Sequence, residues 1–318
     1  MKVSLGRRRW RHLGVVHCPS GGRSYARSHA SGPTPIVLGD VVRVYFQTRD
    51  ERGIGRISFV DLLASDPSRV VRVADGPVLD VGAPGSFDEN GVFPCAVLPM
   101  PGLGLGMFYV GFELGAKVPY RLLTGLAVSS DGGESFERVR RTPVFERSDA
   151  ELLFRCGTWV LARGRGYQAW YVAGSSFDTV GERRVPRYEI RTAHSLDGIA
   201  WPDHGAPVLE RSTDDELGFG RPYVVPRESG WDLYYSVRSR ARQGGYRLGL
   251  AFSADGETWE RADAALGFEP SGDAWDSETQ CYAAALHTDR GKFLFYNGND
   301  YGRAGFGALE LLEDSSHG

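Results

Sequence analysis

The sequence contains few cysteines and methionines, and it lacks any long apolar run. Its 318 residues include 4 Cys and 3 Met. No apolar stretch approaches the roughly 20 residues that a membrane-spanning helix needs. The 37 basic and 40 acidic residues nearly balance, without a basic block. This balance argues against nucleic acid as the main partner. We therefore expect a soluble protein whose partner is neither nucleic acid nor a membrane.

Features of export and of metal binding are also missing. Arg7–Arg9 is similar to part of a twin-arginine signal, but no apolar segment of sufficient length follows it. This favours a cytoplasmic location. The cysteines form no C-x-x-C pair, so in a reducing compartment we expect small buried side chains rather than a zinc site. They are Cys18, Cys95, Cys156 and Cys281.

Glycine and aromatic residues are abundant. The chain has 42 Gly, 7 Trp, 14 Tyr and 16 Phe. Frequent turns between aromatic-rich segments are typical of β-sheet proteins. No long segment shows the 3.6-residue period of a helix, so the sequence predicts an all-β fold.

A short turn motif occurs three times, in 129–136, 195–201 and 253–259. Each copy reads Ser-x-Asp-Gly followed by an aromatic residue. In a tight hairpin the Asp caps the turn and the Gly adopts a positive φ. We expect a strand before each copy, in 122–128, 188–194 and 246–252.

A second repeated element is an alternating strand rich in aromatic residues, found at 42–46, 107–111, 169–174, 232–236 and 293–298. Asp131, Asp197 and Asp255 of the turn motif lie 66 and 58 residues apart. A unit of this size holds about four short strands, which is one propeller blade. We predict one domain, residues 1–318, that forms a five-bladed β-propeller. Trp10–Cys18 would supply the outer strand of the last blade and close the ring.

Three segments, Phe87–Pro94, Trp275–Glu278 and Tyr296–Gly302, resemble a branch of the five-bladed glycoside hydrolase superfamily. That superfamily includes families 43, 32 and 130. The resemblance implies cleavage of a glycosidic bond. The turn at 129–136 also resembles the Asp-box of sialidases, but sialidases have six blades and an arginine triad, whereas this chain has five aromatic strands.

Carboxylates precede four of the five predicted innermost strands. Glycosidic cleavage needs one group to protonate the leaving oxygen and another to activate water or attack the sugar. The candidate catalytic residues are Asp88, Glu216 and Glu278. Each has a simpler interpretation, because Asp88 fits a loop cap and Glu216 follows two acids of a solvated loop.

Other side chains at the same end are candidates for substrate binding. If residues 276–278 are extended, alternation places Asp276 and Glu278 on one face. Arginine suits a substrate carboxylate or phosphate, although pairing with an acid is its common role. Aromatic rings stack on sugars but more often pack in the core. The candidates are His29, Arg49, Glu151, Arg221, Arg238, Trp275, Asp276 and Tyr301.

The first predicted innermost strand departs from the resemblance. Family 43 would place its general base there as an aspartate, but this chain reads His29-Ala30-Ser31. Catalytic carboxylates would then come from other blades. We expect a glycoside hydrolase or phosphorylase acting on a carbohydrate or glycosylated metabolite. The alternatives are a non-catalytic carbohydrate-binding propeller and a propeller repurposed for another reaction. No metal motif is visible and no cofactor is expected, although the fold analogy allows a calcium ion in the channel.

Overall fold

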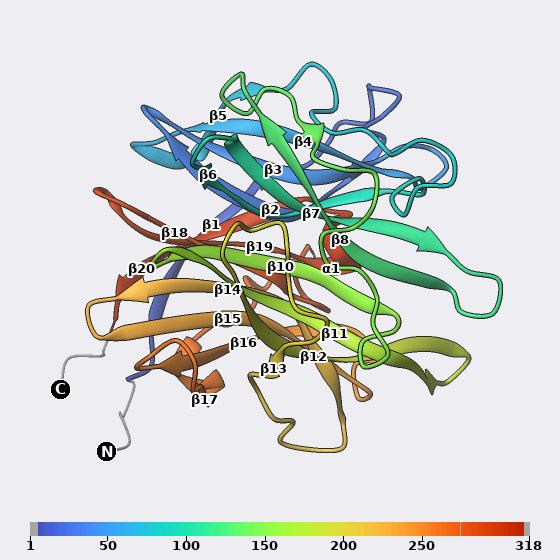
Figure 1. The fold of residues 1–318 in the computed structure, drawn as a ribbon. Coiled ribbons are helices and arrows are strands. Elements are labelled where there is room, and N and C mark those ends of the chain that lie inside the picture. The colour runs from blue at the N-terminus through green and yellow to red at the C-terminus, as the bar shows by residue number, and fades with distance from the viewer. Residues whose placement is uncertain (1–5, 274, 315–318) are drawn as a thin grey trace.

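Nearly all regular structure in this computed structural model is β-strand (Figure 1). The structure describes residues 6–273 and 275–314. The only helical segments in these ranges are the short 3-10 turn η1 (Asp263–Leu266) and α1 (Asn299–Gly302). No helix in the described chain is long and apolar enough to cross a membrane. The predicted all-β class is confirmed.

The strands pair antiparallel in successive groups. The first group contains β2 (Ser28–Leu38), β3 (Val41–Arg49), β4 (Gly55–Leu63) and β5 (Asp66–Val73). The second contains β6 (Val92–Met100), β7 (Gly104–Leu114), β8 (Tyr120–Ser129) and β9 (Glu137–Arg138). The third contains β10 (Phe154–Arg163), β11 (Gly166–Val180), β12 (Arg183–Ser195) and β13 (Ala206–Pro207).

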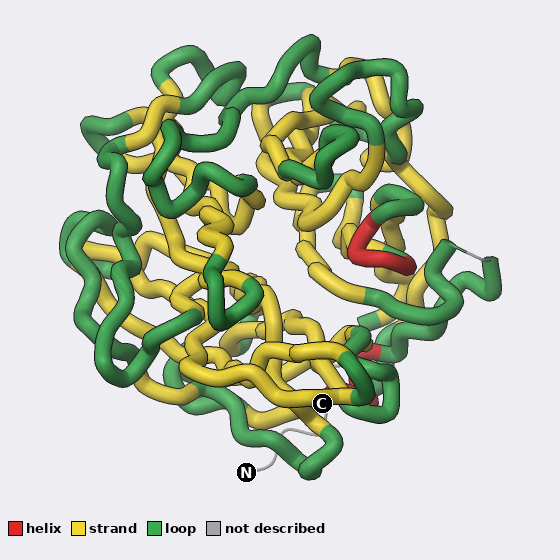
Figure 2. The backbone as a smooth tube through the Cα atoms, turned by 90° about the vertical axis from the view of Figure 1, so that its right-hand side faces the viewer, coloured by secondary structure: helices red, strands yellow, loops and turns green. Residues whose placement is uncertain are grey.

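The fourth group contains β14 (Glu216–Arg227), β15 (Gly230–Ser239), β16 (Tyr246–Ser253) and β17 (Glu260–Arg261). Short parallel pairings of β8 with β10 and of β12 with β14 join the second, third and fourth groups into one twelve-stranded sheet. The last group joins the two ends of the chain, because β18 (Cys281–Thr288), β19 (Gly291–Asn297) and β20 (Phe306–Glu313) are completed by β1 (Arg9–His17). Strand β1 runs antiparallel to β20, with Arg9 opposite Glu313 and His17 opposite Phe306. Figure 2 shows the groups arranged around a common centre.

The predicted aromatic strands are the second strands of the groups, β3, β7, β11, β15 and β19. They are buried because each lies between two other strands and packs against neighbouring groups. Burial of one large apolar side chain contributes about 1.5–3 kcal/mol relative to exposure. A tyrosine recurs at the matching position of each strand and is fully buried there: Tyr45, Tyr109, Tyr171, Tyr235 and Tyr296.

The three repeated turns have the predicted structure. Each follows the third strand of its group, and its aspartate accepts hydrogen bonds from backbone N–H groups. Asp197, for example, accepts from the N–H groups of Ile199 and Ala200 at 2.8 and 2.9 Å. The glycine that follows has a φ of 74° at position 198, which only glycine adopts without strain.

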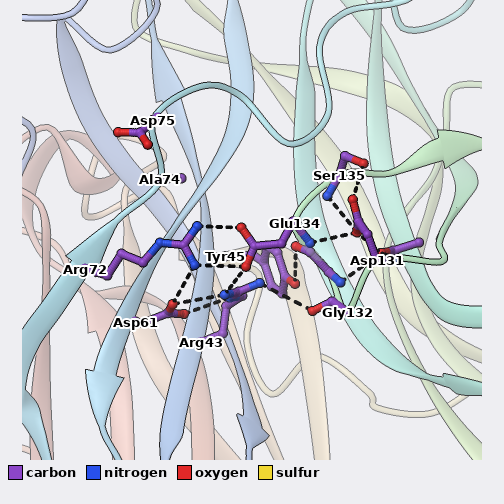
Figure 3. Close-up of polar contacts among 12 residues, drawn as sticks. Arg43, Tyr45, Asp61, Arg72, Ala74, Asp75, Asp131, Gly132, Glu134 and Ser135 are labelled. Carbon is purple, nitrogen blue, oxygen red and sulfur yellow. Dashed lines mark hydrogen bonds and ion pairs between the residues drawn. The ribbon is translucent and has the colours of Figure 1, made fainter.

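These turns also connect neighbouring groups. The Tyr45 hydroxyl donates to the Gly133 carbonyl at 2.9 Å. Beside it, Glu134 of the same turn accepts from Arg43 of β3 and from Arg72 of β5, as Figure 3 shows. A turn in the second group thus fixes the outer surface of the first.

All four cysteines are free thiols. Cys95, Cys156 and Cys281 are buried, as expected. The expectation was wrong for Cys18, which is exposed because it follows the edge strand β1.

Candidate functional site

The innermost strands of the groups, β2, β6, β10, β14 and β18, meet around the centre near their first residues. Each has a bulge there, seen as a shift of register against the second strand. Within these bulges, Arg221 and Tyr282 have φ values of 43° and 61°. A residue other than glycine pays roughly 1–2 kcal/mol for this left-handed conformation. Such strain is often found at functional sites.

Arg221, a predicted binding residue, lies at this centre and is 3% exposed. Its guanidinium donates to the Tyr282 carbonyl at 2.9 Å, and to the Pro33 carbonyl and Thr34 hydroxyl at 2.8 Å each. Burial lowers the pKa of Arg221 below its ordinary value. The Arg221 guanidinium occupies the carbonyl oxygens of Pro33 and Tyr282.

Beside Arg221 lies a group of tyrosines around a second arginine, which we call the mouth cluster. It consists of Arg238, Tyr188, Tyr246, Tyr282 and Tyr301. Arg238 Nε donates to the Tyr188 hydroxyl at 2.9 Å, and Nη2 donates to the Tyr246 hydroxyl at 2.8 Å. Its guanidinium carbon lies 4.3 Å from the centre of the Tyr246 ring. The Tyr246 ring lies 5.8 Å from that of Tyr282 and 5.9 Å from that of Tyr301.

Arg49 and His29 adjoin the mouth cluster from the first strand group. Arg49, at the end of β3, interacts electrostatically with Tyr282 and Tyr301. Burial lowers the pKa of His29 to about 4, and the nearby charge of Arg49 acts in the same direction. The structure thus brings together five of the predicted binding residues: His29, Arg49, Arg221, Arg238 and Tyr301.

The predicted carboxylates have a different setting. Asp88 is fully buried and accepts from the Tyr109 hydroxyl at 2.9 Å, from Arg138 Nε at 2.7 Å and from the Ser86 hydroxyl at 2.9 Å. Glu151 is also buried, where it accepts from the Tyr171 hydroxyl and pairs with Arg155.

Glu216 and Asp276 are likewise buried and held by partners within the fold. Arg261 binds Glu216 through two hydrogen bonds of 2.7 and 2.8 Å. Asp276 accepts from the Tyr296 hydroxyl at 2.7 Å and from Ser271. Three of these four acids are therefore partners of the tyrosine that recurs in the second strand. The fourth group uses Asp263 instead, which accepts from Tyr235 at 2.6 Å.

The expectation that Asp276 and Glu278 share one face is wrong. Residues 275–278 form a turn and bends rather than a strand, so side-chain alternation does not apply. Asp276 is fully buried, whereas Glu278 is exposed. The backbone N–H of Glu278 donates to the side-chain oxygen of Asn299, and Asn299 lies two residues before Tyr301 of the mouth cluster.

Trp275 packs within its own group. Its ring lies 5.0 Å from that of Tyr296, in contact with Gly307 of β20. The structure therefore gives Trp275 the packing role that was the alternative to sugar stacking.

A cleft of about 1510 Å³ lies between the third and fourth groups. Tyr188 of the mouth cluster is among its lining residues, and Arg191, Glu210, Trp259 and Arg261 line it farther out. Tyr188 thus belongs both to the mouth cluster and to the wall of this polar and aromatic cleft.

The Glu216–Arg261 pair predicts a specific dependence of stability on pH. Burial alone would raise the pKa of Glu216, but the hydrogen bonds and charge of Arg261 bring it below its ordinary value of 4.5. Because the folded-state pKa is the lower one, the pair stabilises the fold fully above about pH 4.5 and less as pH falls through that pKa. We expect Glu216→Gln to lower the urea midpoint at pH 7 and to have a smaller effect at pH 3–4. An effect that does not change with pH would contradict this assignment.

Of the tyrosines in the mouth cluster, only Tyr301 was predicted. Tyr246 begins β16 and Tyr188 lies in the middle of β12, each in the strand before a repeated turn. Tyr188 pairs there with Gly218, near the start of the innermost strand β14, so its position held a usable signal. Tyr282 follows Cys281 at the start of β18, where a bulge turns its side chain in a way that alternation does not predict.

Comparison with known proteins identifies relatives along almost the whole chain. No model of a known protein family matches the sequence. Rv1502, an uncharacterised protein of Mycobacterium tuberculosis strain H37Rv, is 33% identical over 306 residues, covering 96% of this chain and 99% of the relative. The chain belongs to the Rv1502 family. A protein of strain CDC 1551 in the same family, MT1551, is 32% identical over the same length.

Solved structures place the Rv1502 family in a known fold. One glycoside hydrolase matches with a TM-score of 0.72 and 19% identity, covering 96% of this chain and 92% of its own. A thermostable family-43 glycoside hydrolase matches with a TM-score of 0.63 and 15% identity, over 92% and 93% of the two chains. A structure from the GH130 family of mannoside phosphorylases matches with a TM-score of 0.69 and 12% identity, over 96% and 94%. The chain has the propeller fold of these glycoside hydrolases, as its resemblance implied.

Proposed function

We propose that this protein is a five-bladed propeller, closed by its N-terminal strand, that binds and cleaves a carbohydrate at the mouth cluster. The order of strand pairing supports the blade count and the closure, since each group supplies one unit and β1 pairs with β20. The observation that carries the functional proposal is the convergence of Arg49, Tyr188, Arg238, Tyr282 and Tyr301 from different strand groups on one end of the centre.

This arrangement suits a sugar. Tyrosine rings offer apolar faces for stacking, and tyrosine hydroxyls and guanidinium groups form directed hydrogen bonds with sugar hydroxyls. The cleft beside Tyr188 would hold the rest of a longer glycan. The carbohydrate-active enzymes among the structural neighbours support the same substrate class.

For the chemical step we propose Glu278 as the acid or base. Among the three predicted catalytic carboxylates it is the exposed one, and its backbone N–H binds Asn299, two residues before Tyr301 of the mouth cluster. We propose that Asp88 and Glu216 act in the fold, because ion pairs and hydrogen bonds already hold their oxygens. A cytoplasmic location remains part of the proposal, supported by the free thiols of the described chain.

The second candidate function is carbohydrate binding without cleavage. It is favoured by the fact that Asp88, Glu151, Glu216 and Asp276 are all engaged within the fold. If these four acids serve only the fold, cleavage depends on exposed acids at the edge of the mouth cluster.

Turnover of glycosides by matched variants tests the proposal. We would measure product release from aryl glycosides and oligosaccharides, with and without phosphate. Loss of a general acid or base costs about 10²–10⁴ in rate, so Glu278→Gln should abolish measurable turnover. Glu228→Gln is the control, because Glu228 is exposed in the β14–β15 turn at the far end of those strands.

The outcomes separate the two candidates. Turnover that survives in Glu278→Gln would overturn the assigned role of this residue. Sugar binding without turnover in the wild-type protein would establish the second candidate instead. Turnover that requires phosphate would identify a phosphorylase.

A further inference from the structure

The arginines around the centre differ from the other buried arginines in their partners. Elsewhere a buried guanidinium faces a carboxylate: Arg8 pairs with Asp232 at 2.5 Å, and Arg43 pairs with Asp61 at 2.7 Å. Within the described chain, no carboxylate lies within ion-pair distance of Arg49, Arg221 or Arg238. Their hydrogen bonds go to neutral groups.

Arg238 is the most informative of the three because it is only 9% exposed and lies between Tyr246, which is buried, and Tyr188, which is half-buried. Two tyrosine hydroxyls accept from its Nε and Nη2 atoms. Arg49 is half-buried and donates to the Gln47 side chain at 3.2 Å. Burial lowers the pKa of Arg49, which reflects the cost of holding its charge away from water. A buried charge is costly unless a group of opposite sign compensates it.

The acids nearest to the mouth cluster do not supply that compensation. Asp300 and Glu278 are both exposed, and neither forms an ion pair with a described arginine. Asp178 does form ion pairs, but its partners are Arg187 and Arg240. The mouth cluster thus carries positive charge, has hydrogen-bond donors, and has no internal anion.

From this geometry we propose that the mouth cluster, together with Arg49, binds the anionic group of a charged sugar, a carboxylate or a phosphate. This inference rests on the proposed carbohydrate site and specifies its substrate class. A guanidinium binds either anion through two parallel N–H donors, and tyrosine hydroxyls add further donors. The anion would provide the charge that Arg49 and Arg238 lack, while the tyrosine rings contact the sugar.

Binding of matched neutral and anionic sugars tests the inference. We would titrate the protein with glucose, glucuronate and glucose 6-phosphate, with galactose and galacturonate, and with inorganic phosphate, by isothermal calorimetry at low and at physiological salt. We expect at least one anionic sugar to bind about tenfold or more tightly than its neutral counterpart, as a charged hydrogen bond predicts. This preference should decrease as salt screens the charges. The uronates and the phosphates distinguish the two sources of the anion.

Variants locate the effect. Arg49→Gln should weaken binding of the anionic sugar about tenfold or more, and should weaken binding of its neutral counterpart less. If Arg238→Gln does not fold, Arg238→Lys takes its place. Because lysine retains the charge, this variant should keep part of the preference for the anionic sugar. The control is Arg290→Gln, since Arg290 is exposed in the turn between β18 and β19, away from the mouth cluster.

Each failure has a distinct meaning. Equal affinity for neutral and anionic sugars would overturn the inference and leave the carbohydrate site standing. A preference for the anionic sugar that Arg49→Gln leaves intact would also overturn it. If neither the sugars nor inorganic phosphate bind, the inference and the proposed function both fail.

Discussion

Replacing Glu151 with alanine is expected to lower the free energy of unfolding by about 3–5 kcal/mol, because it leaves the buried Arg155 guanidinium without its anion. The Glu151 carboxylate is 1% exposed. It pairs with Arg155 Nε at 2.6 Å and Arg191 Nη1 at 3.3 Å, and both of its oxygens accept from the Tyr171 hydroxyl at 2.9 Å. Urea unfolding followed by tryptophan fluorescence would measure the change.

The matched control for this variant is Glu189→Ala. Glu189 also pairs with Arg191, but its side chain is 43% exposed, so we expect a loss of no more than about 1 kcal/mol. Glu151→Gln should fall between the two, since it keeps the shape and loses the charge. A Glu151→Ala protein as stable as the control would show that this carboxylate is not structural and would return it to the candidate binding residues.

Deleting residues 1–17 is expected to prevent stable folding. The deletion removes all of β1 and with it the pairing to β20, the Arg8–Asp232 ion pair and the Trp10 hydrogen bond to the Leu266 carbonyl. Native domains are stable by only about 5–15 kcal/mol, which is less than the sum of such losses. The deletion also exposes β20 as an unpaired edge, which promotes aggregation. Soluble yield and near-ultraviolet circular dichroism would report the result.

A peptide that spans residues 6–18 provides the complementary test, because adding it to the truncated chain should restore solubility and native signal. Arg9→Ala is the control within the strand. The Arg9–Glu313 pair is largely exposed, with side-chain exposures of 65% and 55%, so its loss should change stability little. A truncated protein that unfolds at the wild-type urea midpoint would refute closure by β1.

Most of the secondary structure could be predicted because it depends on short-range patterns. The turn at Asp131 and its two repeats need only an aspartate, a glycine and an aromatic residue in a fixed order. The aromatic strands alternate with a period of two. The pairing of Trp10–Cys18 with the end of the chain was predicted by counting strands, because the last unit lacked an outer strand. Solved structures confirmed the propeller fold.

The candidate site was harder because the same residue types serve two roles. Asp88 and Glu151 stand where a catalytic acid would stand in the sequence, yet buried tyrosines and arginines bind them. Those partners lie between 4 and 50 residues away, at distances that no local pattern specifies. The tyrosine that recurs in each second strand was visible in the sequence, and its need for an acceptor was the available signal. Arg49 and Arg238 were predicted because each lies just after an aromatic strand, and His29 because it lies at the entry of the first innermost strand.

The position of β1 also determines when the protein can finish folding. During synthesis β1 leaves the ribosome first, while its partner β20 lies almost 300 residues later in the chain. Strand β1 therefore remains unpaired until nearly the whole chain has been synthesised. Contacts between such distant segments form slowly, and incomplete chains expose strand edges meanwhile. We expect ribosome-bound chains that end before residue 306 to depend on chaperones, and release of the full chain to be followed by a late ring-closing step.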